Sequence, residues 1–399
     1  MKRFYLALFA IFFVSFGVKA QWMWDISIMQ GIKENINNKE YASAYKALIE
    51  DTERTMNIKP YSVVYKEGTP PSGNKRDYVS LSRYVWPDPS KPDGLPYIHR
   101  DGESNPELKK YDREPLGNMA NAVSTLSLAY FYSNDERYAA KAVDFLKTWF
   151  LDKETGMNPH LEYAQFIPGV NNNKGRQYGL IDTYSFVDML NSIKLLESSG
   201  SYTKEVENGL KQWFAQLLTW WQTSEQGKAE RDGGNNHSLA YDVQLVMYAL
   251  FANDNKTALK VINEYPERRL YKQIEPDGKQ PQELRRTLAF FYSGYNIRHM
   301  VDMVAIAKSL GVELCNASSD DGRSLYKAID FLIPYLGKDV SEWPYKQISG
   351  WESSHQALCE DIFRVVNIDP SRKDYLEIYK KIRRQSPEDR QRLIYGVKF

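Results

Sequence analysis

The segment Gly233-Gly234-Asn235-Asn236-His237 combines residue types that suit the binding of an anion. Its paired glycines let the backbone turn tightly, and an apolar helical stretch follows directly. A helix N-terminus offers unpaired N–H groups and a positive dipole, and both favour an anionic ligand. A lone histidine is more often structural, but a histidine beside two asparagines at such a position is a candidate functional residue.

A second segment, from Gln280 to Asn296, combines arginines with a tyrosine. On a regular helix Arg285 and Tyr292, seven residues apart, share a face, whereas Arg286 and Tyr292 do not. A free tyrosine has a pKa of ~10, so it acts as a base only where nearby cations lower that pKa. The segment therefore predicts either a reactive tyrosine supported by an arginine or an amphipathic helix with solvated arginines.

A third segment, residues 82–107, is rich in proline and aromatic residues. The prolines stiffen the chain, and Tyr84, Trp86 and Tyr97 give it rings to present. Rings exposed in a groove suit stacking on the faces of sugars. Composition alone predicts equally a rigid loop that lines or covers a groove and a structural wrap around the fold.

Helices must position these segments, because apolar residues recur at three- and four-residue spacing along most of the chain. Turn and cap residues separate the helical stretches. The clearest predicted helices are Asn118–Ser133, Ala139–Leu151, Ile181–Ser198, Glu205–Ser224, Ser238–Ala252, Thr257–Glu264, Glu283–Leu310 and Ser324–Leu336.

Sequential helices with short connections pack as antiparallel hairpins, and a long series of them closes into a toroid or curls into a solenoid. No fixed repeat period is visible, so we predict an all-α fold in which residues 21–399 form a single α/α toroid, an incomplete α/α barrel. Two long segments, Pro60–Arg113 and Asn158–Gln177, are rich in Pro, Gly, Asn and charge. We expect them to be functional loops that line a groove.

The N-terminus has the pattern of a signal peptide over residues 1–20. Lys2 and Arg3 precede an apolar run that ends in Val18-Lys19-Ala20, a small-residue cleavage site. The run is shorter than the ~20 residues that a spanning helix needs, although an uncleaved anchor is the alternative. We expect cleavage after Ala20 and a periplasmic or secreted protein, with no membrane association after cleavage.

Charge and composition exclude some classes of partner. Without residues 1–20, the 52 basic and 51 acidic residues become 49 and 51, a net charge of −2. This near-neutral total argues against nucleic acid and membrane partners, so a polyanionic ligand must be bound by a few cations placed in a groove.

The two cysteines, Cys315 and Cys359, could pair or stay as buried hydrophobic residues. Because no His/Asp/Glu cluster has ligand spacing, we expect neither a metal nor another cofactor, and we expect a monomer.

Taken together, the ordered motifs resemble the alginate lyase superfamily of α/α-toroid polysaccharide lyases. The resemblance rests on the stretch from Trp86 to Glu107, the segment 157–169, Asn-Asn-His at 235–237, and Glu-Leu-x-Arg-Thr at 283–287 followed by Tyr292. It spans roughly residues 80–310. Within this superfamily the sequence resembles polysaccharide lyase family thirty-eight more than family five, which is a more distant relative.

The resemblance implies metal-independent β-elimination on a polyuronate, such as alginate, polymannuronate or glucuronan. Asn236, His237 and Arg286 would hold the carboxylate beside C5 and stabilise the enolate-like charge. Tyr292 would protonate the leaving oxygen and, for a mannuronate-like unit, could also remove the C5 proton. For the opposite C5 configuration His237 would be the base. The family pattern selects Arg286, whereas regular helix geometry selects Arg285, and we prefer Arg286 because a first helical turn is often irregular.

Further residues are expected to bind substrate along the groove: Arg285, Tyr84, Trp86, Tyr163, Gln165, Tyr241, Tyr295 and Glu230. Two other functions stay open. An α/α-barrel glycoside hydrolase would need two carboxylates, which Glu230, Asp232, Glu283 and Asp242 could supply. A non-catalytic glycan-binding protein would need none of the placed histidine, arginine and tyrosine.

Overall fold

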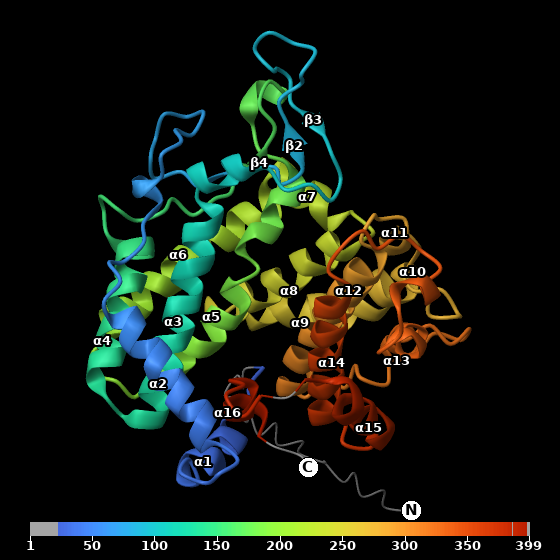
Figure 1. Ribbon diagram of the computed structural model, residues 1–399. Coiled ribbons are helices and arrows are strands. Elements are labelled where there is room, and N and C mark those ends of the chain that lie inside the picture. The colour runs from blue at the N-terminus through green and yellow to red at the C-terminus, as the bar shows by residue number, and fades with distance from the viewer. Residues whose placement is uncertain (1–22, 385, 397–399) are drawn as a thin grey trace, which may run out of the picture.

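Helices dominate the computed structural model, which describes residues 23–384 and 386–396. The predicted signal peptide, residues 1–20, lies outside the described residues. An inner set of helices packs in sequence order, each against the next: α3 (Arg113–Ser133), α5 (Phe186–Ile193), α8 (Asn236–Phe251), α12 (Ala289–Ser309) and α14 (Trp351–Ile368). They curve around a common axis (Figure 1). The predicted all-α toroid is confirmed.

An outer set of helices pairs with the inner set as antiparallel hairpins. α2 and α4 pack on α3, α6 and α9 on α8, α13 on α12, and α15 on α14. Their bounds are Ala42–Met56 (α2), Glu136–Leu146 (α4), Lys204–Thr223 (α6), Asn255–Tyr265 (α9), Leu325–Leu332 (α13) and Lys373–Ile382 (α15). The remaining helices are α1 (Ile26–Glu34), α7 (Glu225–Arg231), α10 (Tyr271–Gln273), α11 (Pro281–Leu284) and α16 (Gln391–Tyr395).

Burial patterns in the sequence explain this division. In α8 every residue except His237 is buried, as expected for a helix that is surrounded by other helices. In α4 only one face is buried, formed by residues such as Tyr138, Ala142 and Phe145, and the opposite face is solvated. Helix α8, which is buried almost all round, therefore takes an inner position, and the amphipathic α4 covers the inner set.

The two predicted loops come together at one end of the ring. Strand β1 (Val79–Leu81), from the first loop, pairs in parallel with β4 (Tyr163–Phe166), from the second. The first loop also forms a small antiparallel hairpin from β2 (Val85–Trp86) and β3 (Ile98–His99). Figure 1 shows these strands gathered at one end of the ring, with α1 and α16 at the other.

Two predicted helices were wrong in their continuity. Residues 283–310 do not form one helix, because the chain leaves helical conformation between α11 and α12, where Leu288 pairs with Gln347. Residues 181–198 form α5 flanked by 3₁₀ turns at Gln177–Thr183 and Lys194–Leu196. In both places tertiary contacts interrupt a helical sequence pattern.

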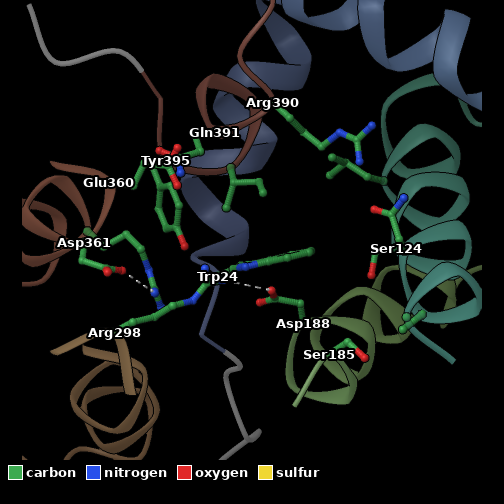
Figure 2. A pocket seen from close by; sticks show the side chains of 16 residues that line it. Trp24, Ser124, Ser185, Asp188, Arg298, Glu360, Asp361, Arg390, Gln391 and Tyr395 are labelled. Atoms are coloured by element: carbon green, nitrogen blue, oxygen red, sulfur yellow. Dashed lines mark hydrogen bonds and ion pairs between the residues drawn. The ribbon is translucent and has the colours of Figure 1, made fainter. Parts of the chain in front are cut away.

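A smaller cavity of about 290 Å³ opens at the end of the ring opposite the loops. Figure 2 shows Trp24 and Tyr395 beside it, with Arg298 directed toward Asp188, whose carboxylate lies 3.8 Å from the guanidinium. The terminal segments thus cover this end of the axis, and the opposite end carries the larger cavity described below.

Two further expectations concern the cysteines and the membrane. Cys315 and Cys359 are both buried and free; Sγ of Cys315 lies 2.9 Å from the Tyr326 hydroxyl, and Cys359 packs in the hydrophobic core. Across residues 23–384 and 386–396, none of the helices has the length and apolar character to span a bilayer.

Candidate active site

A cavity of about 590 Å³ lies where the two loops meet the inner helices. All four residues predicted to be catalytic line it: Asn236, His237, Arg286 and Tyr292. The loops contribute one wall, and the first turns of α8 and α12 contribute the other. Segments that are far apart in sequence are therefore brought to one site.

Tyr292 lies in the first turn of α12 and is 8% exposed. Its hydroxyl is 3.1 Å from the hydroxyl of Tyr84, and the Arg286 guanidinium stands 3.8 Å from the centre of its ring. Burial raises the pKa of Tyr292 well above its ordinary value, the hydrogen bond with Tyr84 raises it further, and Arg286 opposes the shift. At neutral pH the side chain is therefore a protonated phenol.

The break between α11 and α12 decides which arginine meets Tyr292. Arg286 lies in the break, where its Nη2 donates to Oδ1 of Asp101 at 2.9 Å, while the neighbouring Thr287 hydroxyl donates to Oδ2 at 2.8 Å. Arg285 is exposed, lies outside the cavity lining and contacts Gln282 at 3.4 Å. The seven-residue spacing of a regular helix does not apply here, and Arg286 is the arginine beside the tyrosine.

Asn236 and His237 begin helix α8. The side chain of Asn235 caps the helix by accepting a hydrogen bond from the His237 amide at 3.1 Å. Asn236 is fully buried, and both its amide N–H and its Nδ2 donate to Glu283 at 2.7 Å. Its Oδ1 has no hydrogen-bond partner in the described chain. Glu283 therefore fixes the orientation of Asn236 at the cavity wall.

The His237 imidazole is neutral over the whole physiological pH range. Burial lowers its pKa to about 3, and the charges of Arg286, Arg113 and Arg176 act in the same direction. Its Nδ1 has no hydrogen-bond partner among residues 23–384 and 386–396 and lies 3.9 Å from Oε1 of Glu230. A neutral imidazole at this position can accept a proton or donate a hydrogen bond.

None of the four carboxylates that could serve a hydrolase lies at the surface of this cavity. Neither Glu230, Glu283, Asp242 nor Asp232 lines the cavity. Asp242 is buried and accepts from Nε of Arg269 at 2.7 Å, whereas Asp232 pairs with its exposed neighbour Arg231. Burial raises the pKa of both Glu230 and Glu283 to about 7. This part of the chain does not present two carboxylates across a substrate position.

The predicted substrate-binding residues divide into two groups. Tyr84, Gln165 and Tyr295 line the cavity. The others lie outside its lining: Arg285, Trp86, Tyr163, Tyr241 and Glu230.

Local contacts account for the second group. Tyr241 stacks on Trp221 in the core at 5.5 Å between ring centres. The indole of Trp86 donates to the Glu103 carbonyl within the hairpin at 3.0 Å. Tyr163 packs against the small cluster beneath the strands, and Glu230 lies behind His237.

Sequence reasoning missed several residues of the cavity, above all Arg113, Arg176 and Tyr178. Gly175 and Gly179 flank two of them, and a Cβ atom at these glycines would lie 2.6 Å and 2.4 Å from the backbone of Ala164. The glycines therefore let this loop lie against β4. The two segments that carry Arg113 and Arg176, residues 60–113 and 158–177, are predicted to line a groove, but no local sequence pattern distinguishes these two arginines from the others.

The cavity is electropositive although the whole chain is nearly neutral. Four guanidinium groups line it, from Arg83, Arg113, Arg176 and Arg286, against the single lining carboxylate of Asp101. Among the described side chains, no three His, Cys, Asp or Glu residues converge in a way that could hold a metal ion. The site therefore offers placed cations, a neutral imidazole and a phenol to an anionic ligand.

Comparisons with known proteins agree with this chemistry. The family model for alginate lyase matches residues 62–343, more than half of the chain. The crystal structure of an alginate lyase from Bacteroides ovatus is 48% identical, with a TM-score of 0.93 over 95% of this chain and 100% of that one. No curated protein sequence matches.

More distant structures share the fold. Alginate lyase A1-III from Sphingomonas species A1 is 12% identical, with a TM-score of 0.60 over 94% of this chain and 95% of that one. A variant of A1-III complexed with tetrasaccharide is 13% identical, with a TM-score of 0.54 over 82% and 81% of the two chains.

Proposed function

Because the chain belongs to the alginate lyase family and is a polysaccharide lyase, we propose that it cleaves a polyuronate by β-elimination in the cavity around Tyr292. The observation that carries this proposal is the meeting of Tyr292, Arg286, Asn236 and His237 from separate segments in one electropositive cavity. The reaction breaks the C5–H and C4–O bonds of one uronate and forms a C4=C5 double bond.

Neutralising the substrate carboxylate is the first requirement, because the C5 proton is weakly acidic beside a negative charge. We assign this task to Arg286, Asn236 and His237, whose polar groups face one cavity. Fixed donors in a site shielded from water stabilise developing charge strongly, since they need no reorganisation. Asp101 and Glu283 hold Arg286 and Asn236 in place.

Proton transfer follows from the protonation states of the two remaining groups. Tyr292 is a phenol and can give its proton to the leaving glycosidic oxygen. His237 is neutral and can accept the C5 proton when that proton faces it. For a mannuronate-like unit, Tyr292 would first have to lose its proton to solvent as the substrate binds, and the guanidinium over its ring would stabilise the resulting phenolate. The phenolate would then take the C5 proton and pass the same proton to the leaving glycosidic oxygen. The C5 configuration of the substrate then decides which base acts.

Alginate is the polyuronate that we favour, because the 48% identical relative is an alginate lyase. Polymannuronate and glucuronan are further candidates. We also propose that the mature protein acts as a monomer in the periplasm or outside the cell, where such polymers occur. Its place in polysaccharide lyase family thirty-eight stays a prediction.

Incubation with alginate, polymannuronate, polyguluronate and glucuronan tests the proposal. A lyase produces ultraviolet absorbance from a double bond conjugated with the carboxylate. A hydrolase would produce reducing ends without this absorbance, and a binding protein would produce neither. Failure of the purified protein to generate absorbance from any of the four polymers would refute the proposed function.

A further inference from the structure

One wall of the cavity carries an arginine without a counter-ion. The side chain of Arg176 is partly buried, and no carboxylate of the described chain lies within ion-pair distance of it. Its Nε donates to the carbonyl oxygen of Gln165 at 3.2 Å, and its Nη2 donates to the hydroxyl of Ser82 at 2.6 Å. Burying a charge without a partner is costly, so a cation held in this way is prepared for an anion from outside the chain.

The backbone around Gln165 helps to fix this arginine. Gln165 has a φ of 50°, which is uncommon for a residue with a side chain. This conformation turns its carbonyl toward Arg176, while its side-chain Nε2 donates to Asp182 at 2.9 Å. Gln165 was predicted to bind substrate, but these contacts make it a positioning residue for the arginine.

A second guanidinium lies on the same wall. Nη1 of Arg113 is 3.4 Å from Oδ1 of Asp182, but no hydrogen bond of this guanidinium is found in the described chain. Asp182 is already satisfied by hydrogen bonds from Tyr78, Ser80 and Gln165. The donors of Arg113 therefore remain available at the cavity surface.

An aromatic ring, that of Tyr178, lies close to both Arg176 and His237. The Tyr178 ring centre is 5.2 Å from the Arg176 guanidinium and 5.2 Å from the His237 ring centre. Tyr178 is 38% exposed, although it lines the cavity. An exposed ring beside a guanidinium suits the apolar face of a sugar that carries a carboxylate.

We propose that Arg176 and Arg113, with Tyr178 beside them, bind the uronate that adjoins the one losing its C5 proton. This inference rests on the proposed function, in which Arg286, Asn236 and His237 hold the carboxylate of the reacting unit. A polyuronate carries a carboxylate on every sugar, so a neighbouring unit needs its own cations. The enzyme then selects two contiguous uronates rather than a uronate flanked by neutral sugars.

A series of alginates in which carboxylates have been reduced at random to neutral hexoses tests this inference. If the enzyme must bind two adjacent carboxylates, a productive site requires both to be present. The initial lyase rate of the wild-type protein at low substrate concentration then falls with about the square of the carboxylate fraction that remains. Arg176→Gln should change this dependence toward a linear one and raise KM on unmodified alginate about tenfold or more, the scale of a lost charge-assisted hydrogen bond. Its kcat should change much less.

Several controls keep the outcomes distinct. Arg113→Lys keeps a cation beside the buried Asp182, with which Arg113 pairs at 3.4 Å, but removes the guanidinium donors that face the cavity. It should therefore fold normally and shift the dependence in the same direction even if Arg176→Gln unfolds. Arg137→Gln, at an exposed ion pair on α4, should behave as wild type. A linear dependence in the wild-type protein, or a quadratic one retained in both cavity variants, would overturn the inference while leaving the proposed function intact. Absence of absorbance from every polyuronate would instead refute the proposed function.

Discussion

Replacing Tyr292 by phenylalanine should separate catalysis from folding and binding. The variant loses only the hydroxyl, whose hydrogen-bond partner in the structure is the hydroxyl of Tyr84 at 3.1 Å. The ring would stay buried beneath the Arg286 guanidinium, so the lost hydrogen bond should lower the free energy of unfolding by about 0.5–1.5 kcal/mol. A group that transfers a proton in the transition state contributes ~10²–10⁴-fold, so kcat should fall by at least that range.

Initial rates of absorbance increase at saturating and limiting alginate measure this effect. KM should change little, because the carboxylate-binding groups Arg286, Asn236 and His237 are intact. Thermal unfolding should show a transition close to that of the wild-type protein. Tyr84→Phe is the matched control, since it also removes one hydroxyl of the pair but leaves the phenol of Tyr292, and it should lose less activity. A Tyr292→Phe protein with near-wild-type kcat would refute the assignment and direct attention to Tyr295, which lines the same cavity.

Four other outcomes are expected. Arg286→Ala should lower kcat about a hundredfold, the scale of one lost charge-stabilising donor, and Arg285→Ala should lower it less; kinetics giving the opposite order would contradict the cavity geometry. His237→Ala should lose more activity on polyguluronate than on polymannuronate, and equal losses would argue against its role as a configuration-specific base. A pH profile of kcat/KM should rise through about 7 as Glu230 ionises beside His237 and Glu283 ionises beside Asn236, and Glu230→Gln should make that step smaller. Activity should survive excess chelator, whereas a loss restored by calcium or zinc would overturn the metal-free mechanism.

The same Glu230 shift has a consequence for stability. Its pKa is raised by burial from 4.5 to about 7 in the folded chain, so the folded protein binds the proton more tightly than the unfolded one. The resulting contribution to stability is present below about pH 4.5 and is lost as pH rises through about 7. Comparison of thermal unfolding in wild type and Glu230→Gln across this range measures it.

Local sequence patterns were sufficient to predict part of this site. Asn236 and His237 follow a glycine turn and begin a helix, and Tyr292 lies in a long helical stretch, so the elements that carry these residues could be predicted without tertiary contacts. The all-α ring followed from helical periodicity in the same way. Roles for these residues stay predictions until kinetics test them.

Other parts depended on contacts that no local pattern encodes. Arg286 rather than Arg285 meets the tyrosine because Lys346 and Gln347 pair with the chain at the start of α12 and interrupt the helix. Arg176 enters the cavity because its segment folds back on β4, and β4 is held in turn by β1 from the first loop. Tyr241 could have been recognised as a core residue, since the helix that carries it is buried almost all round.

The pairing of β1 with β4 also matters for protein engineering. The amide of Ser82 donates to the Phe166 carbonyl at 2.9 Å, and the Ser82 hydroxyl accepts from Arg176. The two loops are thus one non-contiguous module, even though more than 75 residues separate β1 from β4. A chimaera that transplants only one loop from a related enzyme would misalign the guanidinium groups, whereas exchange of both loops together preserves their register. Substrate range in such designs should follow the pair of loops rather than either loop alone.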